Sequence, residues 1–99
     1  MLLVKGSVDL IMEEGREKAR VTEPCLPFME PVGGTGDLVT GLLTAFAAAG
    51  VPLLRACVLA AQGARFVGER TQPVPSTSIA EFMPFVAEGV SEALSRTTT

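Results

Sequence analysis

The residues best suited to chemistry lie in one glycine-rich stretch, Pro31-Val32-Gly33-Gly34-Thr35-Gly36-Asp37-Leu38. Its glycines let the backbone adopt strained conformations and come close to a ligand. The apolar run after Asp37 predicts a helix, so free backbone N–H groups and one carboxylate would stand at a helix N-terminus, where anions bind. The stretch therefore indicates a phosphate-binding loop. The alternative is a structural turn with Asp37 as the N-cap. A Walker A loop is excluded, because no Gly-Lys-Ser/Thr follows.

The composition narrows the chemistry further. The chain has no histidine, tryptophan or tyrosine. Histidine-based triads and histidine metal sites are therefore excluded, and acid–base work falls to carboxylates, lysines or cysteines. Cys25 is not expected to be a nucleophile, because nothing near it in the sequence would lower its pKa. Cys25 and Cys57 fit neither a zinc pattern nor a disulfide framework, which predicts reduced thiols in a cytoplasmic protein.

Length and charge bound the class of protein. With 99 residues, the chain is expected to form one domain over 1–99, and 47% hydrophobic residues can build a core. A net charge of −3 argues against nucleic acid or an anionic membrane surface as the main partner. No uninterrupted apolar stretch reaches the length of about 18 residues needed to span a bilayer. The first residues acquire charge too early for a secretory signal. We expect a cytoplasmic protein.

Hydrophobic patterning predicts an α/β fold in which strands precede helices. The expected strands cover about 1–5, 8–13 and 18–23, and the expected helices about 37–49, 52–70 and 78–95. Gly50 and Pro52 mark the end of one helix and the start of the next. Ser78 and Glu81 have the spacing of a capping box. Pro84 lies in the first two turns of the last range, where a proline can move the start of a helix.

Two segments carry a resemblance to a known family. Leu3-Val4-Lys5-Gly6-Ser7-Val8-Asp9-Leu10-Ile11, Gly33-Gly34-Thr35-Gly36-Asp37-Leu38-Val39-Thr40-Gly41 and the two alanine-rich helices that follow resemble the C-terminal part of ADP- or ATP-dependent NAD(P)HX dehydratases. That family belongs to the ribokinase-like superfamily, together with hydroxyethylthiazole kinase and carbohydrate kinases. The resemblance covers nearly the whole chain and implies a truncated ribokinase-like fragment.

The resemblance also implies a set of site residues. Nucleotide contacts are implied for Lys5, Gly6, Ser7, Val8 and Asp9, and phosphate binding for Gly34, Thr35 and Gly36. Asp37 would be the catalytic carboxylate, and ADP or ATP with Mg²⁺ the cofactor. The family removes water from hydrated NAD(P)H through a phosphorylated intermediate. In a kinase relative, the same aspartate takes the proton from the attacking hydroxyl.

A family domain is much longer than this chain, which suggests a missing portion. A thin sheet with two buried-looking helices also leaves apolar surface uncovered, so we expect a homo-oligomer or a complementary chain. Three hypotheses stay open: part of a split enzyme, a non-catalytic nucleotide-binding module, or an interaction module in which the glycine-rich turn only caps a helix. Nucleotide binding without turnover would favour the second hypothesis, and a lack of nucleotide binding would leave the third.

Overall fold

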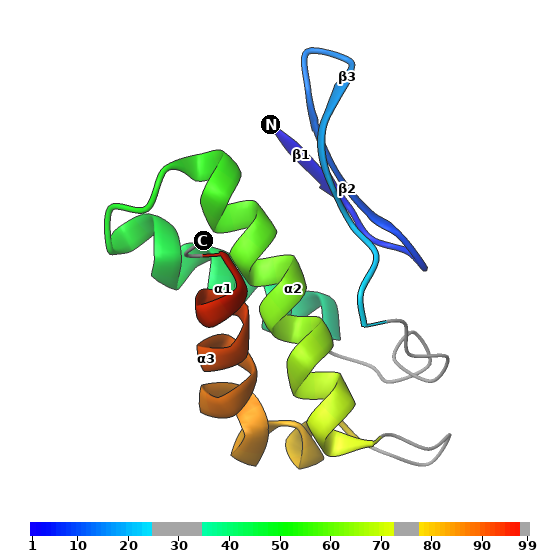
Figure 1. Ribbon diagram of the computed structural model, residues 1–99, viewed down its shortest axis with the longest axis vertical. Coiled ribbons are helices and arrows are strands. Elements are labelled where there is room, and N and C mark those ends of the chain that lie inside the picture. The colour runs from blue at the N-terminus through cyan, green and yellow to red at the C-terminus, as the bar shows by residue number, and fades with distance from the viewer. Residues whose placement is uncertain (25–34, 73–77, 98–99) are drawn as a thin grey trace.

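The described part of the chain folds into a three-stranded antiparallel sheet followed by three α-helices (Figure 1). The computed structural model describes residues 1–24, 35–72 and 78–97. The strands are β1 (Leu2–Val4), β2 (Asp9–Glu13) and β3 (Arg16–Val21), in the order β1-β2-β3. They confirm the three predicted strands, although β3 begins and ends two residues before the predicted range of about 18–23. Glu14 and Gly15 have φ values of 54° and 76° in the turn between β2 and β3, as a tight hairpin turn requires.

The register of the sheet separates an inner and an outer face. Leu3 pairs with Ile11, whose side chain is fully buried against the helices. The neighbouring pairs are Leu2 with Met12 and Val4 with Leu10, and alternation along a strand places them on the opposite face. We call Leu2, Val4, Leu10 and Met12 the outer apolar face. Because β1 is also an edge strand, this face borders an unpaired strand edge among the described residues.

The first two helices meet where the predicted helix-ending and helix-starting residues lie. Helix α1 spans Thr35–Ala48 and α2 spans Leu53–Thr71. Gly50 has a φ of 89°, a conformation that favours glycine and ends a helix. Pro52 is the residue directly before α2, so the proline stands at the predicted boundary. The N-cap alternative for Asp37 is wrong, because α1 begins at Thr35 and Asp37 is the third residue of the helix.

The last helix starts later than predicted. The range 78–95 begins with two short 3₁₀ turns, η1 (Ile79–Glu81) and η2 (Met83–Phe85), and only then continues as α3 (Val86–Thr97). Pro84 lies inside η2 and cannot donate the backbone hydrogen bond that a continuous helix would need there. The capping-box prediction is confirmed, because the Ser78 N–H donates to Glu81 Oε2 at 2.8 Å, although it caps η1.

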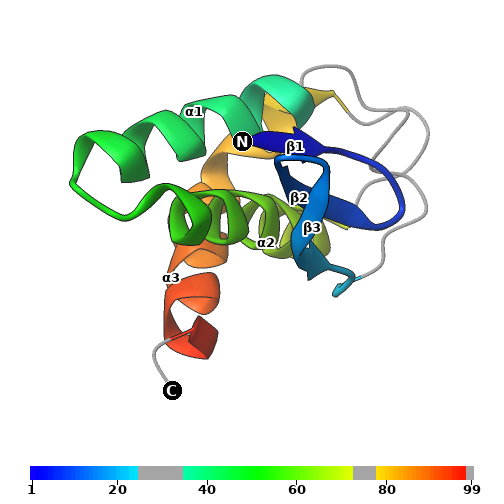
Figure 2. The same cartoon turned by 90° about the horizontal axis from the view of Figure 1, so that it is seen from above.

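Helix α2 is the centre of the structure, between the sheet on one side and α1 and α3 on the others (Figure 2). Cys57 and Ala61 of α2 pack against Ile11 and Val21 of the sheet. Ala60 and Ala64 belong to a second cluster that includes Leu38 of α1. The small residues of α2 thus permit close packing on several sides, as predicted. No helix within the described ranges is long and apolar enough to cross a membrane.

Candidate functional site

The turn after β1 is organised around the buried carboxylate of Asp9. Asp9 is the first residue of β2, and its side chain is fully buried. Its Oδ1 accepts the backbone N–H of Gly6 at 3.1 Å, and its Oδ2 lies 3.5 Å from the Lys5 ammonium. A buried carboxylate needs such partners, because an unpaired buried charge is very costly. The contacts hold the predicted Lys5–Asp9 segment in one compact turn.

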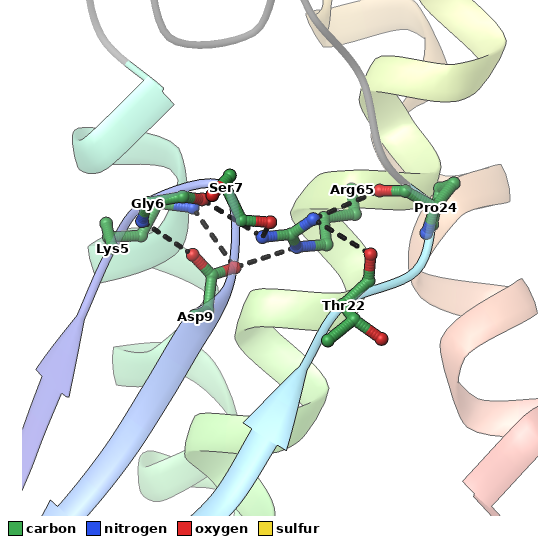
Figure 3. Close-up of polar contacts among 7 residues, drawn as sticks. All are labelled: Lys5, Gly6, Ser7, Asp9, Thr22, Pro24 and Arg65. Carbon is green, nitrogen blue, oxygen red and sulfur yellow. Dashed lines mark hydrogen bonds and ion pairs between the residues drawn. The ribbon is translucent and has the colours of Figure 1, made fainter.

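The second anchor of this turn is Arg65, which comes from the middle of α2 (Figure 3). Arg65 is only 5% exposed, and its Nε donates to Asp9 Oδ2 at 2.9 Å. Its Nη2 donates to the carbonyls of Gly6 and Ser7 at 3.1 and 3.0 Å. Its Nη1 donates to the carbonyls of Thr22 and Pro24 at 3.4 and 3.1 Å. Arg65 therefore ties the turn after β1 to the segment that leaves β3.

The other predicted site residue with a described side chain is Asp37, in the first turn of α1. Its side chain is exposed, and no ion pair or hydrogen bond to its carboxylate is found within the described residues. A negative charge there is favoured by the positive end of the helix dipole. Asp37 also borders a groove of about 380 Å³, otherwise lined by Leu38, Gly41, Leu42, Ile79, Met83 and Val86. The carboxylate is thus accessible beside an apolar depression.

The turn after β1 and the start of α1 lie on the same side of the molecule. Leu3, two residues before the turn, packs against the cluster that contains Leu38 and Val39 of α1. Figures 1 and 2 both show α1 beginning beside the sheet and running away from it. The fold therefore joins the strand before the Lys5–Asp9 turn and the start of α1 through a shared core.

Of the three predicted phosphate-binding residues, the structure describes two, Thr35 and Gly36. Gly34 lies outside the described residues, and so does Cys25. Thr35 is the first residue of α1. Gly36 follows in the same helix, and a Cβ at this position would meet no described atom within 4 Å. Among the described residues, the fold therefore gives no packing reason for a glycine at position 36.

Sequence reasoning did not single out Arg65. The signal was available, because Arg65 is the one charge within the stretch Ala60-Ala61-Gln62-Gly63-Ala64-Arg65-Phe66-Val67-Gly68. A charged residue inside a stretch of small and apolar residues is rarely buried unless it is paired. Its partner Asp9 is 56 positions away in the sequence, so only the tertiary structure identifies the pair.

The remaining reactive groups do not form a second site in the described part of the chain. No cluster of three or more acidic, cysteine or histidine side chains that could hold a metal ion occurs in the described residues. Burial raises the pKa of the Cys57 thiol, partly opposed by the amino terminus, and Cys57 Sγ lies 3.8 Å from Met1 Sδ. The thiol is therefore a core group, since reactive cysteines need a lowered pKa and access to solvent.

Comparison with known proteins gives one distant relative. The chain is similar to the uncharacterized protein MJ1337 of Methanocaldococcus jannaschii, with 27% identity over 93 residues. The match covers 94% of this chain and 40% of that protein, so the chain spans well under half the length of its relative. No family model matches the chain. No solved structure matches it either.

Proposed function

We propose that this chain is the nucleotide-binding part of a ribokinase-like enzyme that resembles an NAD(P)HX dehydratase or a small-molecule kinase. ADP or ATP would bind between the Lys5–Asp9 turn and the N-terminus of α1. The observation that carries the proposal is the start of α1, where Gly36 has open space around it and an exposed carboxylate follows. Gly41 has equal space around it, so the open space matters at Gly36 because that glycine stands in the first turn of α1, where free N–H groups allow a ligand close to the backbone.

The first turn of α1, Lys5 and Asp37 could together bind a nucleotide with Mg²⁺. The N–H groups of the first helical turn can donate to phosphate oxygens, and the Lys5 ammonium, which is partly exposed, can offset their charge. The described residues contain no group of three or more side chains that could hold a metal ion, so Mg²⁺ would bind together with the nucleotide phosphates. The Asp37 carboxylate would accept the proton of a substrate hydroxyl.

Activity would require a further polypeptide surface, from a second copy or a complementary chain. The outer apolar face supports this, because Leu2 of β1 is 61% exposed and lies beside the open edge of the sheet. Exposed apolar patches and strand edges of this kind are typical of interaction sites. The match covers only 40% of the relative, which also supports a need for further polypeptide. The alternative function is a non-catalytic nucleotide-binding or interaction module with the same surface.

Titration calorimetry with ADP and ATP in Mg²⁺ tests the nucleotide site, with Gly36→Ala as the central variant. An alanine at position 36 has room in the described structure and favours a helix, so the melting temperature should not fall. Its Cβ would meet the phosphates, and we expect the Kd to rise at least about tenfold, which is about 1.4 kcal/mol.

Gly41→Ala is the matched control, because it makes the same change in α1 with equal space around the Cβ, more than a turn from the helix start. It should bind nucleotide like the wild type. Asp37→Asn should still bind the nucleotide. In the presence of the second copy or complementary chain that activity requires, it should show no turnover. A folded wild-type chain that binds neither ADP nor ATP would refute a nucleotide site on this chain.

A further inference from the structure

The guanidinium of Arg65 has no hydrogen-bond donor left for a ligand. A guanidinium carries five N–H groups. In this structure Nε makes one hydrogen bond, Nη1 makes two and Nη2 makes two, all to protein oxygens. Arg65 is also almost completely buried. Arg65 can therefore affect a ligand only through the protein groups to which it is hydrogen-bonded.

Those groups belong to the turn that we propose as half of the nucleotide site. The carbonyls of Gly6 and Ser7 and the carboxylate of Asp9 all face Arg65 (Figure 3). Asp9 adds one more restraint, because its Oδ1 accepts the Gly6 N–H. The turn is thus fixed from its inner side by one charge pair and by hydrogen bonds to its backbone.

The outer side of the turn keeps groups that can meet a ligand. The Ser7 side chain is exposed. Within the described residues, no backbone hydrogen bond is found for the N–H groups of Ser7 and Val8. The carbonyls of the same two peptide groups, those of Gly6 and Ser7, are held by Arg65. In a trans peptide the N–H points away from the C=O, so the two donors are presented away from Arg65 in a fixed arrangement. Preorganised donors bind an anion more tightly than mobile ones, because less ordering is required on binding.

We infer that Arg65 is a positioning residue, which holds the Lys5–Asp9 turn in the conformation that binds the phosphate part of the nucleotide. The inference rests on the proposed function for the identity of the ligand. It uses observations independent of the glycine-rich segment, namely the hydrogen bonds of Arg65 and Asp9. Arg65 also bonds the Thr22 and Pro24 carbonyls, so the same side chain sets the position of the turn relative to the exit from β3.

The decisive variant is Arg65→Lys, which keeps the positive charge. A lysine has its three donors on one nitrogen and cannot reach two separate groups of carbonyls together with Asp9. We expect the Kd for ADP to rise at least about tenfold, measured at a temperature at which both proteins are folded. Arg55→Lys is the matched control, because Arg55 lies on the same helix but is exposed, and it should bind ADP like the wild type.

Amide hydrogen exchange measured by NMR gives a local readout that does not need a nucleotide. In Arg65→Lys, the Gly6 amide should lose its protection, while the amide of Ile11 in β2 stays protected. Uniform loss at both amides would mean general destabilisation and would overturn a positioning role. If Arg65→Lys does not fold, Asp9→Asn takes its place, because it preserves side-chain volume but weakens the hold on Gly6 and Arg65.

The two readouts separate failure of this inference from failure of the proposed function. If the wild type binds no ADP, the proposed function fails, and selective loss of protection at Gly6 still supports Arg65 as the residue that positions the turn. If the wild type binds ADP and Arg65→Lys binds it equally well with Gly6 still protected, the positioning role is wrong and the proposed function stands.

Discussion

A close contact between α2 and α3 makes a quantitative prediction about Gly89 of α3. A Cβ at position 89 would overlap Val67 Cγ2, and it would stand 2.6 Å from Val67 N and 3.0 Å from the Gly63 carbonyl oxygen. Two of these three atoms belong to the backbone of α2, so a side-chain rotation cannot relieve the overlap. Gly89→Ala therefore forces α2 and α3 apart.

The expected magnitude follows from two opposing effects. Overpacking of a dense core costs about 1–3 kcal/mol, and the backbone overlap places Gly89→Ala at the upper end of that range. Replacing glycine by alanine inside a helix returns about 1 kcal/mol. We expect a net loss of about 2 kcal/mol in the free energy of unfolding. For a domain of this size that lowers the melting temperature by about 8–16 °C.

Gly63→Ala is the matched control, because it makes the same substitution on the other side of the same interface. Its Cβ would lie 3.6 Å from Leu42 and 3.7 Å from a Val90 methyl, which are ordinary contacts. We expect it to raise stability by up to about 1 kcal/mol. Urea denaturation and calorimetric melting of both variants measure these changes in stability. A Gly89→Ala protein as stable as the wild type would refute this account of the α2–α3 interface.

Two further predictions concern the buried thiol and the outer apolar face. Because burial raises the pKa of Cys57 in the folded state, the free energy of unfolding should fall as the pH rises above about 8.5, and Cys57→Ala should remove this slope in urea denaturation. A slope that persists in Cys57→Ala would assign it to another group. Leu2→Lys should weaken self-association in light scattering, whereas Leu53→Lys, which alters an exposed leucine on α2, should not. Equal masses for wild type and Leu2→Lys would exclude the outer apolar face as the contact.

Local patterns in the sequence predicted most of the fold. Short apolar segments located β1 and β2, and alternation located β3 to within two residues. Gly50 and Pro52 located the boundary between α1 and α2, because these residues have strong local conformational preferences. The late start of α3 followed from competition between a helical pattern and Pro84. Sequence periodicity alone could not decide how many residues the proline would remove from the helix.

The candidate site divides in the same way. Gly36 and Asp37 are adjacent in the sequence, so their placement at the start of a helix could be predicted from local rules. The Asp9–Arg65 pair could not, because its members are 56 positions apart and meet only when α2 packs on the inner face of the sheet.

The sequence by itself therefore determined the approximate strands, the boundary between α1 and α2 and the chemistry available to a site without histidine. Only the tertiary structure decided which of the charged side chains are buried in ion pairs and which are exposed to solvent. It buried Asp9 against Arg65 and left Asp37 exposed, although both are aspartates that follow a glycine within three residues. The physical reason is that burial and charge pairing depend on contacts between distant segments, whereas turns and caps depend on neighbouring residues.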